Sequence, residues 1–214
     1  MANAITIGRL VLLFVVIWLI YVGNVTIIAA CMLLLMLVFA ADGVDGWVAR
    51  KQGTTSTFGA VFDIAGDRMV ENSLWVIFAH LDVIPVWVPL LVLSRGFIVD
   101  GLRSLSFAEG MTAFGEKNMM RSPITQWLTA GRLMRALFGY MKAAGFVFLT
   151  GLVAWETKDT NGTALGALYS QQWFRWFGWL LVWGAVALTV VRGLPVLWDA
   201  FPYMRELDRR KRAG

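Results

Sequence analysis

Long apolar stretches recur along the chain and are separated by short polar segments. Each stretch is close to the length of helix that crosses a hydrocarbon core of about 30 Å, since a helix rises about 1.5 Å per residue. They cover residues 7–22, 25–41, 59–80, 84–105, 127–154 and 174–200. This pattern predicts an all-α integral membrane protein with six transmembrane helices. The connections are short and nothing resembles an interdomain linker, so we expect a single membrane domain over residues 1–214.

The composition supports a membrane protein over an ordinary soluble one. Hydrophobic residues make up 58% of the chain and charged residues only 15%, against about 25% charged in typical soluble domains. The first apolar stretch has no basic leader before it and no cleavage-like site after it, so we expect it to be a retained helix rather than a signal peptide. Cys31 is the one cysteine, and its apolar surroundings predict a small buried side chain.

The placement of basic residues predicts the orientation, because loops rich in Lys and Arg stay on the cytoplasmic side. With six spans, one side of the membrane carries Arg9, Arg50, Lys51, Lys117, Arg121, Arg205, Arg209, Arg210, Lys211 and Arg212. The opposite side carries mainly Lys158 and Arg175. We therefore expect both termini to be cytoplasmic, in the cell inner (plasma) membrane. A basic tail beside a terminal span favours contact with anionic membrane lipids, and no nucleic-acid partner is expected.

Four acidic residues gather where the second apolar stretch ends and the third begins. They are Asp42, Asp45, Asp63 and Asp67. On helices, the first two are separated by about 60° and the last two by about 40°, so each pair shares a face. Carboxylates crowded at a lipid boundary repel one another unless cations compensate them, and oxygen ligands without His or Cys favour Mg²⁺ or Mn²⁺. The pattern predicts a polar metal site facing the cytoplasm. Helix capping, or ion pairs with Arg50 and Arg68, is the alternative explanation.

Small residues and one arginine flank these carboxylates. Gly43, Gly46, Gly59 and Gly66 leave room for a phosphate or nucleotide to approach the backbone, although close helix packing would equally explain Gly66. The forked, permanently charged side chain of Arg50 suits either a pyrophosphate oxygen or a structural carboxylate.

The same residues carry a specific resemblance. Together they reproduce DxxDGxxAR followed by GxxxDxxxD, the signature of the CDP-alcohol phosphotransferase family, at Asp42, Asp45, Gly46, Ala49, Arg50, Gly59, Asp63 and Asp67. The resemblance implies a six-helix membrane fold, usually a homodimer, with a cavity open to the cytoplasm and two divalent cations. It also implies transfer of a phosphatidyl group from CDP-diacylglycerol to a small alcohol, with release of CMP.

The resemblance further implies a role for each matching position. The four aspartates would bind the metals, and Asp67 would also be the general base. The positions expected to bind the nucleotide and pyrophosphate are Gly46, Ala49, Arg50 and Gly59.

Arginines outside the signature suggest a phosphorylated acceptor. They lie on the fourth and fifth stretches, at Arg95, Arg103, Arg132 and Arg135. Together they could form a second anion site, although anchoring of helix ends at the cytoplasmic face is an alternative. The segments SRGFIVDGLRS and GRLMR, with Asn3, Thr6 and Arg9 near the start, resemble the phosphatidylglycerophosphate synthases of the family. That likeness implies glycerol 3-phosphate as the acceptor and a place in phospholipid biosynthesis.

Two features depart from that subgroup's pattern, and other functions stay open. Gly96 stands where an acidic residue is expected, and arginine replaces lysine at 132 and 135.

Inositol phosphate, serine or another alcohol are alternative acceptors. A cation transporter is disfavoured because the acids lie at one face and no inverted repeat is evident. A non-catalytic scaffold is a further alternative, and His80 is expected to be structural.

Overall fold

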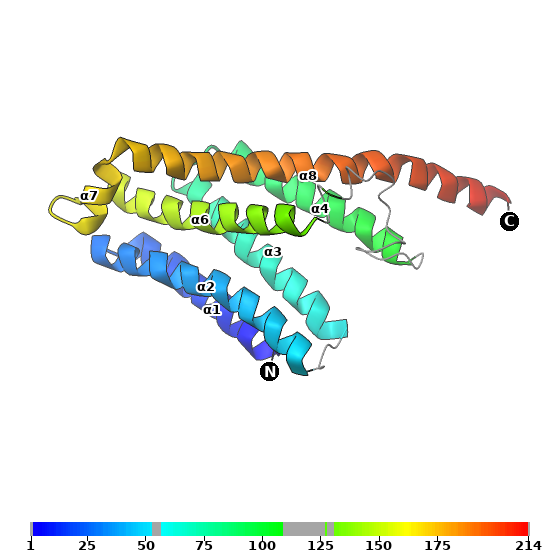
Figure 1. Ribbon diagram of the computed structural model, residues 1–214, viewed down its shortest axis with the longest axis horizontal. Coiled ribbons are helices and arrows are strands. Elements are labelled where there is room, and N and C mark those ends of the chain that lie inside the picture. The colour runs from blue at the N-terminus through cyan, green and yellow to red at the C-terminus, as the bar shows by residue number, and fades with distance from the viewer. Residues whose placement is uncertain (1, 53–56, 109–126, 128–130, 214) are drawn as a thin grey trace. The chain divides into compact units, whose positions relative to one another are not determined.

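The computed structural model describes residues 2–52, 57–108, 127 and 131–213, and most of these residues are helical (Figure 1). The helices are α1 (Ala2–Val22), α2 (Val25–Gln52), α3 (Thr57–His80), α4 (Trp87–Ala108), α6 (Arg132–Thr157), α7 (Ala164–Ser170) and α8 (Gln172–Ala213). No strand occurs within these described ranges. The predicted all-α fold is therefore confirmed.

Six of these helices are long, and each coincides with one of the apolar stretches. Leu133–Thr157 of α6 and Gln172–Pro195 of α8 are long and apolar enough, by length and composition, to cross a membrane. Shorter apolar helices cover Thr6–Val22 and Val25–Ala40. Helix α7 was not predicted, and α8 continues well beyond residue 200 into the basic tail. These properties agree with membrane association, and the number of spans stays a prediction.

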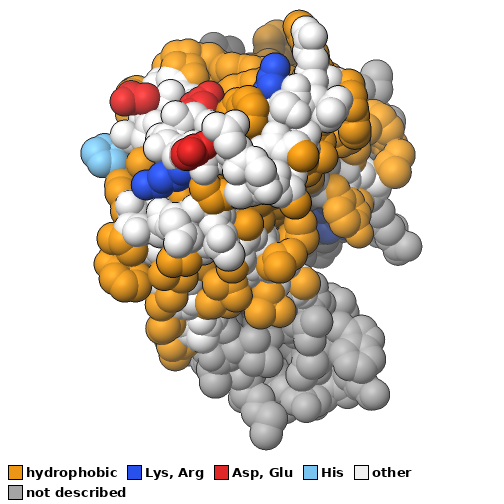
Figure 2. All heavy atoms as spheres, turned by 90° about the vertical axis from the view of Figure 1, so that its left-hand side faces the viewer, with side chains coloured by type: hydrophobic (Ala, Val, Ile, Leu, Met, Phe, Trp, Pro, Cys, Tyr) orange, Lys and Arg blue, Asp and Glu red, His pale blue; other side chains and the backbone are white. Residues whose placement is uncertain are grey.

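Helix α1 exposes apolar side chains on one face, and its buried face combines polar with apolar side chains. The exposed face carries Ile7, Val11, Phe14 and Trp18, each more than half exposed, while Thr6 and Arg9 are 3% and 4% exposed. The exposed residues recur every three or four positions, so they form one face of the helix. In water this arrangement would expose apolar area and bury charge at a cost, whereas in lipid it is favourable. Figure 2 shows one face of the molecule, where hydrophobic side chains likewise predominate over charged ones.

The chain forms two compact units. The first comprises Met1–Pro89 and Lys142–Val182, and the second comprises Leu90–Met141 and Trp183–Gly214. In the first unit, Phe146 is the centre of an aromatic core: its ring lies 4.7 Å from the Trp75 ring and is stacked with Phe39 and Phe78. Aromatic pairs of this kind stabilise a core beyond the area they bury.

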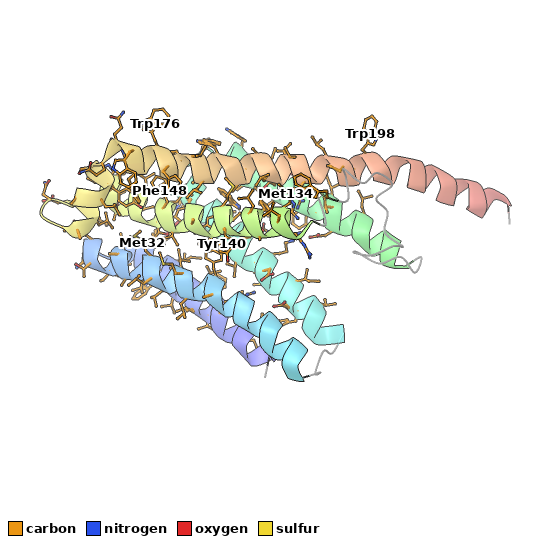
Figure 3. All side chains as sticks on the ribbon, in the orientation of Figure 1. Met32, Met134, Tyr140, Phe148, Trp176 and Trp198 are labelled. Atoms are coloured by element: carbon orange, nitrogen blue, oxygen red, sulfur yellow. The ribbon has the colours of Figure 1, made fainter. Side chains whose placement is uncertain are left out.

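Helix α7 is attached to α6 within the first unit by one buried tyrosine. The Tyr169 hydroxyl donates a hydrogen bond of 2.7 Å to the Phe148 carbonyl, and the two rings stack at 5.6 Å. Burial raises the pKa of the Tyr169 phenol, so the hydroxyl remains a neutral donor. Tyr169 also lies over Gly151, where a Cβ would meet its hydroxyl oxygen and would lie 2.7 Å from its Cζ. Figure 3 shows Phe148 on α6, and Trp176 pointing outward from α8.

The second unit joins α4, α6 and α8 through close contacts at small residues. A Cβ at Gly193 of α8 would lie 2.9 Å from Cγ of Arg95 on α4, and one at Gly184 would lie 2.1 Å from Cε of Met141 on α6. Small residues let membrane helices pack tightly in this way.

Candidate functional site

Three helices of the first unit bring the two halves of the predicted site to one end. Helix α1 packs against both α2 and α3. The start of α1, the end of α2 and the start of α3 lie at the same end of this group (Figure 1). Residues 42–50 belong to the second half of α2, and residues 59–67 belong to the first half of α3. The fold therefore places both parts of the signature on neighbouring helices near the N-terminus.

The α2 half of the site is described only as helical backbone. Asp42, Asp45, Gly46, Ala49 and Arg50 are part of α2, but their side chains lie outside the described residues. The geometry of the site therefore comes from α1 and α3.

The described acids of α3 form a row along one side of the helix. Asp63, Asp67 and Glu71 follow one another at four-residue intervals, which offsets each by about 40° from the last. Oδ1 of Asp63 is buried, whereas the Asp67 side chain is 49% exposed. Gly59, one turn before Asp63, is half-buried. The row thus begins with the predicted ligands and continues with an acid that the signature does not contain.

Helix α1 contacts this row through the two residues singled out at its start. Nη2 of Arg9 donates a hydrogen bond of 2.6 Å to Oδ1 of Asp67, and the Arg9 side chain is only 2% exposed. Thr6 lies one turn earlier, and its Cγ2 would be 2.7 Å from a Cβ at Gly66. Gly66 therefore permits the close approach of α1 that brings Arg9 to Asp67, in addition to any room it leaves for a ligand.

Glu71 has partners on two helices. Nζ of Lys142 on α6 donates to Oε2 of Glu71 at 2.7 Å, and Arg68 lies 3.9 Å from the same oxygen. Sequence reasoning missed Glu71 and Lys142, although both fall inside apolar stretches where an ionisable residue is a functional or structural suspect. That signal could have found them. The predicted alternative for Arg68, an ion pair with a carboxylate, involves Glu71 here.

The donor chemistry fits a hard divalent cation. Among the described side chains, no group of three or more His, Cys, Asp or Glu residues could hold a metal ion. The described part of the predicted set supplies two carboxylates one turn apart, Asp63 and Asp67, and oxygen atoms of this kind are the ligands that Mg²⁺ and Mn²⁺ prefer.

The predicted acceptor arginines belong to the second unit. Arg95 of α4 packs against Gly193 of α8, and Arg135 of α6 is exposed. The side chains of Arg103 and Arg132 lie outside the described residues.

The structure adds Arg192 to this group. It is 9% exposed and lies over the Phe138 ring at 4.9 Å, one turn beyond Arg135. Arg192 is an ionisable residue inside the last apolar stretch. The sequence could therefore have singled it out, as it could Lys142. The second unit therefore holds described arginines on three helices.

The described surroundings of His80 agree with a structural role. Its ring lies 5.8 Å from that of Tyr21, at the end of α3 opposite the acids. Cys31 is buried, as expected.

Comparison with known proteins identifies relatives over most of the chain. A model of the CDP-alcohol phosphatidyltransferase family matches residues 1–191. A relative from Rickettsia typhi, named CDP-diacylglycerol--glycerol-3-phosphate 3-phosphatidyltransferase, is 33% identical over 47% of this chain and 57% of its own length. Proteins of the same name from Haemophilus influenzae and Cereibacter sphaeroides are 29% and 26% identical, over 59% and 81% of this chain and 72% and 82% of theirs. The chain spans little more than half the length of the Rickettsia relatives that it matches, 57% and 56%.

Proposed function

The chain belongs to the CDP-alcohol phosphatidyltransferase family, and from this premise we propose its reaction. It transfers the phosphatidyl group of CDP-diacylglycerol to glycerol 3-phosphate, forming phosphatidylglycerol phosphate and releasing CMP. The relatives from three bacterial genera that carry the corresponding enzyme name support this acceptor.

One observation carries the proposal: the complete signature falls on two neighbouring helices that reach the same end of the first unit. Its first half lies in α2 and its second half in α3, and the α3 half is contacted by Arg9. A transporter would place its acids near the membrane midplane, whereas we propose that these lie at the cytoplasmic face, as the distribution of basic residues predicts.

The reaction forms one bond and breaks one. The hydroxyl oxygen of glycerol 3-phosphate attacks the phosphorus that carries the diacylglycerol, and the bond from that phosphorus to the bridging pyrophosphate oxygen breaks. CMP departs with that oxygen. Asp67, half exposed on α3, accepts the hydroxyl proton as general base. Arg50 binds a pyrophosphate oxygen, and Gly46, Ala49 and Gly59 leave room for the cytidine and pyrophosphate.

The family is generally dependent on divalent cations, and two Mg²⁺ or Mn²⁺ ions would be held by Asp42, Asp45, Asp63 and Asp67. When bound, such ions neutralise the pyrophosphate oxygens and stabilise the leaving group. Both sets of carboxylates lie on helices packed against α1 rather than on loops, so the positions at which they would hold the ions are fixed.

The phosphate of the acceptor requires a cationic site of its own. Arg95, Arg135 and Arg192 supply the described part of it, and Arg103 and Arg132 complete the set. Burial of Arg192 strengthens its interaction with an anion, since water competes less for the guanidinium. Forked arginines bind phosphate in a fixed orientation.

The proposal includes a membrane setting. The six long helices span the inner membrane as a single domain over residues 1–214, with both termini and the site on the cytoplasmic side, and the protein is a homodimer. The exposed apolar face of α1 and the outward-pointing Trp176 and Trp198 of α8, 67% and 80% exposed, support burial of these surfaces in lipid or in a second copy (Figure 3).

An acceptor assay tests the proposed reaction. Purified protein in liposomes is given CDP-diacylglycerol and Mg²⁺ with glycerol 3-phosphate, inositol phosphate, serine or phosphatidylglycerol, and both CMP and the lipid product are measured. With glycerol 3-phosphate, we expect CMP and phosphatidylglycerol phosphate to form in equal amounts. Release with another alcohol but not with glycerol 3-phosphate would overturn the acceptor, and no release with any alcohol would overturn the transferase.

A further inference from the structure

We infer that Arg9 is a positioning residue for Asp67: its guanidinium fixes the carboxylate that binds metal and accepts the acceptor's proton. The inference rests on the proposed function and deepens it. No part of the Asp signature includes α1, so this role follows from the contact between α1 and α3 rather than from the signature residues.

The geometry shows which of the two side chains is held in place. Arg9 is 2% exposed and Asp67 is 49% exposed, and Nη2 of Arg9 lies 2.6 Å from Oδ1 of Asp67. The arginine is therefore enclosed by the protein, while the carboxylate extends toward the accessible side. A planar fork on a packed stem resists rotation, so its contact with Oδ1 restricts the motion of the carboxylate.

The packing around this pair supports a rigid arrangement. Thr6 lies one turn before Arg9 and against Gly66, the residue that precedes Asp67. A Cβ at Gly66 would lie 2.7 Å from Cγ2 of Thr6 and 3.3 Å from Nη2 of Arg9. Two adjacent positions of α3 are thus matched to two positions one turn apart on α1, which sets both the spacing and the register of the helices.

The hydrogen bond from Arg9 would affect how Asp67 binds a metal ion. Metal ligands need supporting hydrogen bonds that set their orientation, and loss of such a partner commonly reduces metal affinity or activity by about 10- to 100-fold. A charge effect alone would act in the other direction, because removing a nearby cation strengthens the binding of Mg²⁺ or Mn²⁺. The two explanations therefore predict opposite changes in metal affinity.

The test is a double-mutant cycle read by Mn²⁺ binding, without liponucleotide or acceptor. Bound Mn²⁺ is measured by electron paramagnetic resonance for the wild type, Arg9→Ala, Asp67→Asn and the double variant. We expect each single substitution to weaken Mn²⁺ binding about 10-fold or more, and the double variant to bind as weakly as Asp67→Asn alone. Arg9→Lys, which keeps the charge and one donor, should bind with intermediate affinity.

Two further variants keep the result interpretable. Lys142→Met breaks another ion pair of α3, at Glu71, and serves as the matched control: it should lower thermal stability but leave Mn²⁺ affinity unchanged. Arg9→Gln is measured beside Arg9→Ala, so that the cycle can be completed if the smaller side chain prevents folding.

The outcomes separate this inference from the proposed function. Unchanged or tighter Mn²⁺ binding in Arg9→Ala and Arg9→Gln, or additive losses in the double variant, would overturn the positioning role. A wild type that binds Mn²⁺ but does not use glycerol 3-phosphate would overturn only the acceptor. A wild type that binds no Mn²⁺ would overturn the metal site, and the role of Arg9 with it.

Discussion

Lys142 of α6 donates a 2.7 Å hydrogen bond to Glu71 of α3, and the two residues are 71 positions apart in the chain. Glu71 is 8% exposed and the Lys142 side chain is 18% exposed, so the pair is largely buried. It lies one turn beyond Asp67 and holds α6 against the helix that carries the predicted metal ligands.

Removing one member of this pair should destabilise the protein strongly. Lys142→Met leaves the Glu71 carboxylate buried, with the longer 3.9 Å contact from Arg68. Breaking a buried ion pair in this way costs about 3–5 kcal/mol, whereas replacing both members by neutral groups costs much less. Thermal unfolding in detergent should therefore show a large drop in Tm for Lys142→Met and a smaller one for Glu71→Gln/Lys142→Met. Equal losses in the two variants would show that the pair does not couple the helices.

Gly151 should tolerate no side chain, because the Tyr169 ring occupies its surface. A Cβ there would lie 2.3 Å from the Tyr169 hydroxyl and 2.7 Å from Cζ. Gly151→Ala is expected to destabilise the protein by about 1–3 kcal/mol through overpacking. The control is Gly139→Ala on the same helix, where nothing lies within 4 Å and alanine should stabilise by about 0.5–1 kcal/mol. Tm values that fall equally for both would contradict the described packing of α7 on α6.

Gly66 should be required for the contact between α1 and α3. In Gly66→Ala the new methyl group meets Cγ2 of Thr6 and approaches Nη2 of Arg9, so the side chains of α1 at this contact must shift. Displacements of this size near reacting groups reduce turnover by about 10- to 100-fold. Thr6→Ser removes the opposing methyl group, and the double variant Gly66→Ala/Thr6→Ser should recover part of the rate of CMP release. If the double variant recovered none of the rate of CMP release, contact with Thr6 would not be the cause of the loss.

Arg192→Ala should weaken binding of the acceptor more than binding of the liponucleotide. A hydrogen bond to a charged group contributes about 1.5–3 kcal/mol, which corresponds to a rise of about 10- to 100-fold in KM for glycerol 3-phosphate. The KM for CDP-diacylglycerol should change little. Arg175→Ala is the control, since Arg175 of the same helix contacts Trp155 and the Tyr169 carbonyl in the other unit. Equal rises in both Michaelis constants for Arg192→Ala would indicate a structural role.

The helices were predictable from the sequence because each is a long apolar run bounded by polar residues. The run 25–41 predicted the helix that begins at Val25, and 59–80 predicted the one that ends at His80. Helix α7 was not predictable in this way. It is seven residues long, and a helix of that length depends on tertiary contacts, here the Tyr169 hydroxyl on the Phe148 carbonyl.

The candidate site was predictable only as far as its residues are close in sequence. Helical spacing was enough to pair Asp63 with Asp67, since they are one turn apart. It could not pair Arg9 with Asp67, or Lys142 with Glu71, because these contacts depend on which faces of separate helices meet. The roles of the signature residues stay predictions, and the side chains of Asp42 and Asp45 lie outside the described part of the site.

The central claim is that divalent cations bound by aspartates of α2 and α3 support phosphatidyl transfer, and metal dependence of the reaction tests it most directly. Protein in liposomes with CDP-diacylglycerol and glycerol 3-phosphate is treated with a chelator, and CMP is measured before and after Mg²⁺ or Mn²⁺ is restored. We expect CMP release and phosphatidylglycerol phosphate formation to stop with the chelator, to return with either cation, and to stay absent in Asp67→Asn. Release of CMP that continues undiminished in the chelator would contradict the account.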